Sequence, residues 1–184
     1  TTHNYRNDDY LKLMPTVEFF NKKNLTTVRM GNIKEKIDKK YFSHNHIDFY
    51  DSTKDGSDDV KLCSNCIFYI GDTSGLAMLS VLFGVPVVRY NWVPIFNSLP
   101  YRTLMIPMLF KDRSNQQLVP FRKIWEMKKK GMEIWHSALS LEKQGLEIVK
   151  NSSEDIKNIS IEMFERINDN YNFKEQHPFQ KKFV

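Results

Sequence analysis

The segment CIFYIGDTSGLAMLSVLFGVPVVRY, residues 66–90, decides the fold class of this chain. An apolar run ends at Gly71, a short polar turn follows, and an apolar helix over 75–83 leads through Gly-Val-Pro into a second apolar run. Near-continuous apolar strands are typical of a parallel sheet that helices cover on both faces. The order of strand, turn, helix and strand therefore predicts a β-α-β unit with strands at 67–71 and 86–90.

The preceding sequence extends this alternation of strands and helices. Apolar runs predict strands at 25–30 and 47–50, and a helix is predicted to end near Asn65 with Ser57 or Asp58 as its cap. We expect all four strands to share one parallel sheet. The predicted fold class is α/β, with an open, doubly wound, mainly parallel sheet.

The pattern loosens after Trp92. The sequence there predicts an ordered loop with a short strand within 104–110, followed by a helix over 121–131. A further short strand then leads to a final helix, for which Ser152 or Ser153 is the expected cap.

Length and composition indicate a single globular domain rather than a disordered chain. The sequence has 184 residues, of which 41% are hydrophobic, and its formal net charge is +5. A mildly basic balance suits an anionic ligand or a membrane surface, and no nucleic-acid-binding motif is recognised, so no nucleic-acid partner is expected. We expect residues 1–170 to form one domain, as part of a longer protein, and 171–184 to form an extended tail.

Two cysteines, Cys63 and Cys66, form a single C-x-x-C. A zinc site needs about four ligands, and the nearest histidines, His44 and His46, lack a ligand-like spacing. A redox role is the alternative, but the two positions lie at the end of a predicted helix and the start of a strand, where Cys acts as a small apolar filler. We therefore expect structural, reduced thiols and no metal site.

The turn after the 67–71 strand is the candidate site. Helix N-termini at the carboxyl ends of parallel strands carry unpaired N–H groups and partial positive charge, which suit a phosphate. Glycine on either side of the turn would let the backbone approach a ligand. The alternative is that Thr73 or Ser74 only caps the helix, and the turn has neither G-x-G-x-x-G spacing nor the lysine of a P-loop.

The wider segment SDDVKLCSNCIFYIGDTSGLAMLSVLFGVPVV, residues 57–88, resembles the carboxyl-terminal half of GT-B glycosyltransferases. More narrowly, VRMG, IDFYDS, CIFYIGDTSGL and FGVPVVRYN resemble a family of bacterial glycosyltransferases of surface-carbohydrate loci. A looser version of the pattern occurs in fucosyltransferases and in non-hydrolysing sugar-nucleotide epimerases. The resemblance covers roughly residues 5–95 and the final helix, and implies a Rossmann-like GT-B carboxyl-terminal domain.

The resemblance implies a nucleotide-sugar donor whose binding residues lie on the turn, the preceding helix and two strand ends: Asp72, Thr73, Ser74, Gly75, Ser57, Asp58, Arg29 and Asn91. Ser74 and Gly75 would take the diphosphate, while Ser57 and Asp58 would lie near the base or ribose. Arg29 would be the bidentate phosphate partner, or else an exposed strand charge. Enzymes of this kind work without a bound metal, so no cofactor is expected.

The implied activity is transfer of a sugar from the nucleotide-sugar to a surface-glycan or lipid-linked acceptor. A missing amino-terminal domain would carry the acceptor and the catalytic base, which stays unassigned. His3 and Arg6 could approach the cleft, or belong only to a polar terminus. The expected location is cytoplasmic, either away from membranes or at the inner face of a membrane with peripheral contact to it. The alternatives are a sugar-nucleotide 2-epimerase-like enzyme and a non-catalytic interaction domain that keeps the fold.

Overall fold

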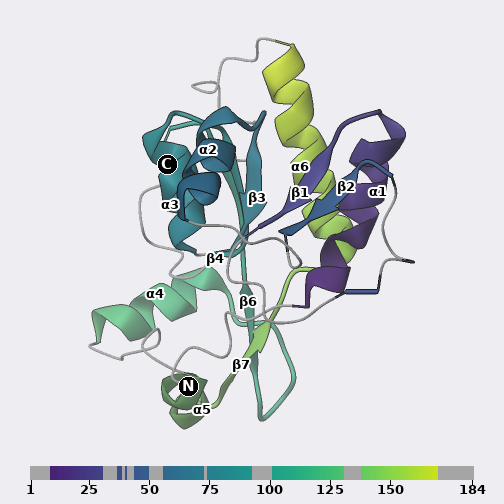
Figure 1. The fold of residues 1–184 in the computed structure, drawn as a ribbon. Coiled ribbons are helices and arrows are strands. Elements are labelled where there is room, and N and C mark those ends of the chain that lie inside the picture. Colours follow the sequence, from purple (N-terminus) through teal and green to yellow (C-terminus); the bar gives the residue numbers. More distant parts are fainter. Residues whose placement is uncertain are drawn as a thin grey trace.

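A computed structural model of the chain describes residues 9–30, 37–38, 40, 44–49, 56–72, 74–92, 101–130 and 138–169 (Figure 1). The described helices are η2 (Tyr10–Leu13, a 3-10 helix), α1 (Met14–Lys22), α2 (Gly56–Asn65), α3 (Gly75–Leu82), α4 (Phe121–Lys129), α5 (Ala138–Lys143) and α6 (Ser153–Asn168). The described strands are β1 (Thr27–Arg29), β2 (His46–Asp48), β3 (Tyr69–Gly71), β4 (Val87–Trp92), β5 (Thr103–Pro107), β6 (Leu109–Asp112) and β7 (Leu146–Val149). These elements form a mixed α/β fold with mostly parallel sheets, compatible with a Rossmann-like fold.

Strands β3, β4 and β5 form a parallel sheet in that order. Gly71 of β3 pairs with Arg89 of β4, so the predicted parallel pairing of the two apolar runs is confirmed. Strands β1 and β2 are also parallel, but they form a sheet of their own. The prediction of one sheet for all four strands is therefore wrong for the described residues, because β1 and β3 both border one cavity instead of pairing with each other.

The third described sheet is an antiparallel pair, β6 and β7. The sequence predicted one short strand within 104–110, whereas the structure has two strands separated by the buried Met108. β5 ends at Pro107, and the N–H of Met108 still donates to the carbonyl oxygen of Trp92 on β4. The chain then leaves the parallel sheet and pairs with β7. Around β6, β7, α4 and α5, a second core forms from Phe110, Val119, Ile124, Leu141 and Leu146.

Helix α6 covers one face of the β3-β4-β5 sheet. Val88 and Leu104 of the sheet pack with Ile159 and Met163 of the helix. The hydroxyl of Ser152 accepts a hydrogen bond from the N–H of Asp155, whose side chain in turn accepts from the N–H of Ser152. The predicted cap of the final helix is therefore confirmed, in the form of a capping box.

Helix α2 corrects the predicted cap of the preceding segment. It begins at Gly56, so Ser57 and Asp58 lie inside its first turn rather than before it. Asp58 and Asp59 place carboxylates in this first turn, where they interact favourably with the positive end of the helix dipole. Among the described residues, none of the helices is both long enough and apolar enough to cross a membrane.

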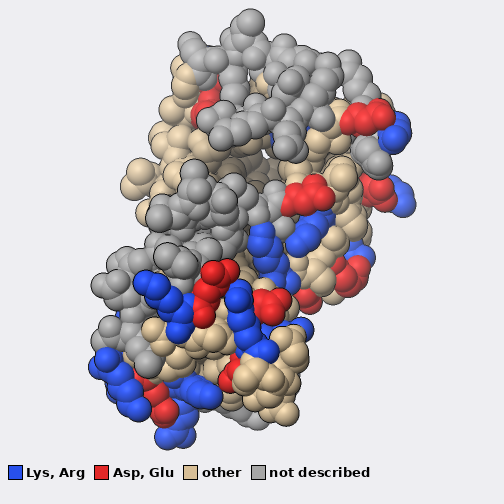
Figure 2. All heavy atoms as spheres, turned by 90° about the horizontal axis from the view of Figure 1, so that it is seen from below, with Lys and Arg blue, Asp and Glu red and all other residues tan. Residues whose placement is uncertain are grey.

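Surface charges of both signs are mixed, as Figure 2 shows for one face of the molecule. The ammonium groups of Lys128 and Lys129 lie 5.4 and 5.5 Å from the ring centre of Trp125 on α4. Exposed ion pairs such as Arg122 with Glu126 contribute about 0–1 kcal/mol each. The surface charges therefore add little to the stability of the fold, in contrast to the buried charge at Arg89 described below.

Candidate functional site

The turn between β3 and α3 lies at the carboxyl end of a parallel sheet, as the sequence predicted. Ser74 is the residue before α3 and has an extended backbone, but its side chain makes no capping hydrogen bond. Its hydroxyl oxygen instead lies 3.4 Å from the hydroxyl oxygen of Tyr69. The alternative in which Ser74 only caps the helix is therefore wrong, and Thr73 lies outside the described residues.

The two glycines of the turn differ in their surroundings. A Cβ added at Gly71 would lie 2.5 Å from Cε1 of Tyr69, so the missing side chain lets this ring cross the end of the strand and reach Ser74. Burial raises the pKa of Tyr69 to about 12, so its hydroxyl keeps its proton near neutral pH. Apart from its chain neighbours and the nearby backbone of its own helix, no described atom lies within 4 Å of a Cβ added at Gly75. Gly71 therefore has a packing role, whereas Gly75 leaves open space at the start of the helix.

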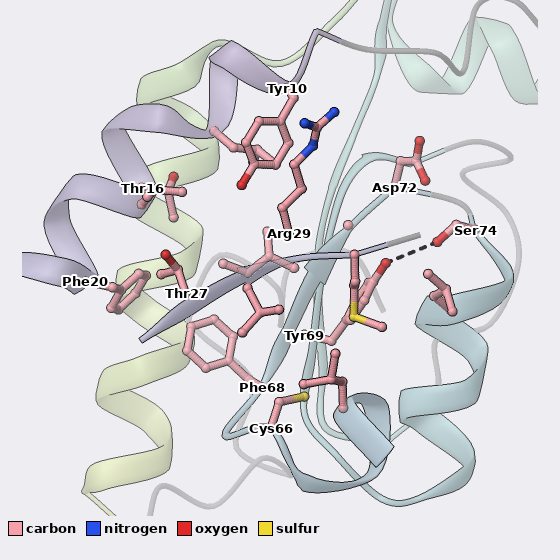
Figure 3. A pocket seen from close by; sticks show the side chains of 18 of the residues that line it. Tyr10, Thr16, Phe20, Thr27, Arg29, Cys66, Phe68, Tyr69, Asp72 and Ser74 are labelled. Atoms are coloured by element: carbon pink, nitrogen blue, oxygen red, sulfur yellow. Dashed lines mark hydrogen bonds between the residues drawn. The ribbon is translucent and has the colours of Figure 1, made fainter. Parts of the chain in front are cut away.

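A cavity of about 1550 Å³ runs between the α1–β1 side of the molecule and the β3–α3 side. Figure 3 shows Tyr10 and Arg29 on the first side, and Asp72 and Ser74 on the second. Gly75 also lines the cavity. The structure therefore brings four of the predicted site residues together: Arg29, Asp72, Ser74 and Gly75.

Arg29 lines this cavity, and its guanidinium already forms an ion pair with Asp48. Its Nη1 donates to Oδ2 of Asp48 at 3.2 Å, and its guanidinium lies 4.6 Å from the ring centre of Tyr10. The side chain is 11% exposed, so the alternative of an exposed strand charge is wrong. Because Asp48 neutralises part of its charge, Arg29 would attract an anion less strongly than an unpaired arginine at the same place.

The remaining predicted residues do not line the cavity. Ser57 and Asp58 are on the first turn of α2, where Asp58 pairs with Lys61 at 3.5 Å. Asn91 is 1% exposed within β4, and its N–H donates to Oδ1 of Asn151 at 2.6 Å. The N–H of Asn151 donates back to Oδ1 of Asn91 at 2.8 Å, so this pair joins β4 to the chain just before α6.

Arg89 is the feature of this region that the sequence interpretation missed. It lies on β4 beside Gly71 and is 2% exposed. Its Nη2 donates to Sδ of Met78 at 3.1 Å, and its guanidinium lies 4.7 Å from the ring centre of Trp92. The signal was present in the sequence, because an arginine inside a strand predicted to be buried on both faces is a buried charge.

The two cysteines are free thiols. Cys63 is buried and its Sγ lies 3.6 Å from the carbonyl oxygen of Leu76 on α3. Burial raises the pKa of both thiols, that of Cys66 to about 11. These contacts favour the packing role that the sequence predicted. Within the described ranges, no group of three or more His, Cys, Asp or Glu side chains could hold a metal ion.

The site thus consists of an open helix N-terminus, a hydroxyl pair and Arg29 around one cavity, while Arg89 on the strand beside Gly71 does not itself line that cavity. Arg29 reaches the cavity from β1 with a carboxylate partner, and Arg89 lies under the start of α3 without one. Comparisons of the chain with protein-family models, with curated proteins and with solved structures found no match.

Proposed function

We propose that this chain is the donor-binding part of a metal-independent glycosyltransferase of the GT-B type. It binds a nucleotide-sugar with the diphosphate at the N-terminus of α3 and passes the sugar to a glycan or lipid-linked acceptor. The observation that carries the proposal is that Ser74 leaves the first turn of α3 without a side-chain cap, next to open space at Gly75 in a large cavity. The resemblance over residues 57–88 supports the same placement of the diphosphate.

The chemistry of sugar transfer explains why such a helix terminus is useful. Negative charge grows on the diphosphate as the bond to the sugar breaks, and fixed N–H groups and the positive end of a helix dipole stabilise that charge. No acidic side chain lies in the first turn of α3 to compete for this positive end. The acceptor and the catalytic base would come from a second, amino-terminal domain.

The experiment is a calorimetric titration of the chain with nucleoside diphosphates and nucleotide-sugars, repeated with Gly75→Val. A Cβ at this position has open space around it, so we expect the variant to fold and its side chain to occupy the space that the diphosphate needs. We expect it to bind donor at least roughly tenfold more weakly than the parent, which corresponds to about 1.4 kcal/mol.

The matched control is Gly56→Val. Gly56 is the first residue of α2 as Gly75 is of α3, and a Cβ added there also meets nothing within 4 Å among the described residues. It does not line the cavity, so this variant should bind like the parent. If the parent binds no member of the panel, or if Gly75→Val binds as well as Gly56→Val, the proposal is wrong.

A further inference from the structure

Three arginines with described side chains are largely buried, and they differ in their partners. Arg29 pairs with Asp48, and Arg166 pairs with Glu162 one helical turn away. No carboxylate of the described residues lies within ion-pair distance of Arg89, although Arg89 is the most deeply buried of the three. Its Nε has no hydrogen-bond partner within the part of the chain that the structure describes.

The contacts that Arg89 makes stabilise its buried charge less than hydrogen bonds to water or to an anion would. A thioether sulfur is a poor acceptor, and a guanidinium over an indole ring gains about 0.5–2 kcal/mol. Burial without an anion disfavours the charged form, and accordingly it lowers the pKa of Arg89. Within the described residues, Arg89 is therefore a buried cation without a hydrogen-bonded or ion-paired carboxylate.

Arg89 lies close to the N-terminal end of α3. Arg89 is the register partner of Gly71, the last residue before the turn, and Met78 is in the first turn of α3. The guanidinium therefore lies beneath the start of this helix. Met78 is 46% exposed, so an anion that displaces its flexible thioether reaches the guanidinium from solvent.

The electrostatic neighbours of Arg89 do not neutralise it. Tyr69 and Asp72 lie close enough to favour its charged form, but neither forms an ion pair or hydrogen bond with it that would satisfy the Nε donor. Tyr69 keeps its proton near neutral pH, as its raised pKa requires. The hydroxyls of Tyr69 and Ser74 are thus available as neutral polar neighbours of a bound anion.

We propose that Arg89 is an anion-binding residue of the α3 site, where its guanidinium contacts a phosphate group held at the helix N-terminus. This inference rests on the proposed function, because it concerns the same site. It assigns the main cationic contact with the phosphate to Arg89 of β4 rather than to Arg29 of β1. Two donors of the planar guanidinium match two oxygens of a phosphate, a geometry that an ammonium does not offer.

The test uses the full chain, with inorganic pyrophosphate as the probe, and combines calorimetry with thermal unfolding. Arg89→Met should bind pyrophosphate at least roughly tenfold more weakly than the parent. Its unfolding midpoint without ligand should be unchanged or raised, because an apolar side chain in place of an unpaired buried charge is neutral or stabilising. A purely structural arginine predicts the reverse, namely a lower midpoint and unchanged pyrophosphate affinity, and that result would overturn the proposal.

The matched control is Arg122→Met. This substitution removes the same charge from a side chain that is 90% exposed on α4, so pyrophosphate affinity should stay at the parent value. An equal loss of affinity in both variants would show that only net charge matters and would overturn the proposal.

A measurement on the parent protein keeps the test valid if Arg89→Met does not fold. The ¹⁵Nε–Hε resonance of Arg89, assigned by its loss in Arg89→Lys, should shift as pyrophosphate is added. A resonance that stays in place while pyrophosphate binds would overturn the proposal.

The outcomes also separate this inference from the proposed function. Pyrophosphate binding that depends on Arg89, with no binding of any nucleotide-sugar, would support the anion site and contradict the glycosyltransferase function. Nucleotide-sugar binding that Gly75→Val abolishes and Arg89→Met leaves intact would support the function and overturn the role of Arg89.

Discussion

Helices α3 and α6 both follow a serine with extended backbone, yet their first turns are completed differently. Ser152 (φ −76°, ψ 161°) accepts a hydrogen bond from the N–H of Asp155 and forms a capping box with it. Ser74 (φ −107°, ψ 162°) has a similar backbone, but its hydroxyl lies near Tyr69 and caps nothing. The N-terminus of α6 is therefore satisfied by the chain itself, whereas that of α3 is left open toward a cavity.

The sequence explains part of this difference. Three residues after Ser152 stands Asp155, which can return a hydrogen bond, whereas three residues after Ser74 stands Ala77, which cannot. Glu154 and Asp155 also place negative charge at the positive end of α6, and the first turn of α3 has no acidic residue. An N-terminus whose first turn has neither a side-chain cap nor a carboxylate suits an anion from outside.

The largest effect is expected where the α3 turn is packed most tightly. Gly71→Ala would place Cβ 2.5 Å from Cε1 of Tyr69 and force the ring away from Ser74, at a cost of about 1–3 kcal/mol in the free energy of unfolding. Gly75→Ala meets no described atom and should be neutral, or stabilising by up to about 1 kcal/mol. Urea denaturation measures both. Equal destabilisation by the two variants would show that the glycines do not differ as described.

The next effect tests the two serines directly. Ser152→Ala removes a cap and should lower the free energy of unfolding by about 1 kcal/mol. Ser74→Ala removes no cap, so its effect on unfolding should be smaller, but it should weaken donor binding by roughly ten- to a hundredfold through the loss of a hydrogen bond to a charged group. A loss of stability in Ser74→Ala as large as that in Ser152→Ala would contradict the contrast between the two helices.

The sequence predicted the elements of this region well because the pattern there is local. The apolar runs, Gly-Val-Pro and the polar turn are adjacent in the chain, and parallel pairing of β3 and β4 follows from the helix between them. The single four-stranded sheet was wrong because contact between β1 and β3 depends on packing between distant segments, which no local pattern records.

The site was predicted less completely for the same reason. The turn was found, but the roles of its neighbours depend on partners far along the chain. Asn91 pairs with Asn151, 60 positions away, and the charge of Arg29 is balanced by Asp48 on another strand. Arg89, by contrast, could have been identified from the sequence alone, because it is a charged residue inside a strand that is buried along its length.

The smallest expected effect is on the rate of thiol labelling. The labelling rate of Cys63 measures how often the first turn of α3 moves away from α2. Cys63 is fully buried, and its Sγ lies 3.6 Å from the carbonyl oxygen of Leu76, so a reagent reaches it only when α2 and the start of α3 separate. We expect slow labelling of Cys63 in the native protein, and slower labelling still with bound pyrophosphate, because a ligand of the folded state suppresses such opening.

Cys66 provides the internal comparison, because it is half-buried and its Sγ lies 4.0 Å from the carbonyl oxygen of Cys63 on α2. Burial raises its pKa to about 11, so at about pH 8 little of it is thiolate, and its labelling rate should rise roughly tenfold for each pH unit toward that value. Pyrophosphate should leave this rate unchanged. The readout is mass spectrometry of labelled native protein over time. Equal slowing of both thiols by pyrophosphate would mean that the ligand stabilises the whole fold rather than the start of α3, and unhindered labelling of both would contradict their packing role.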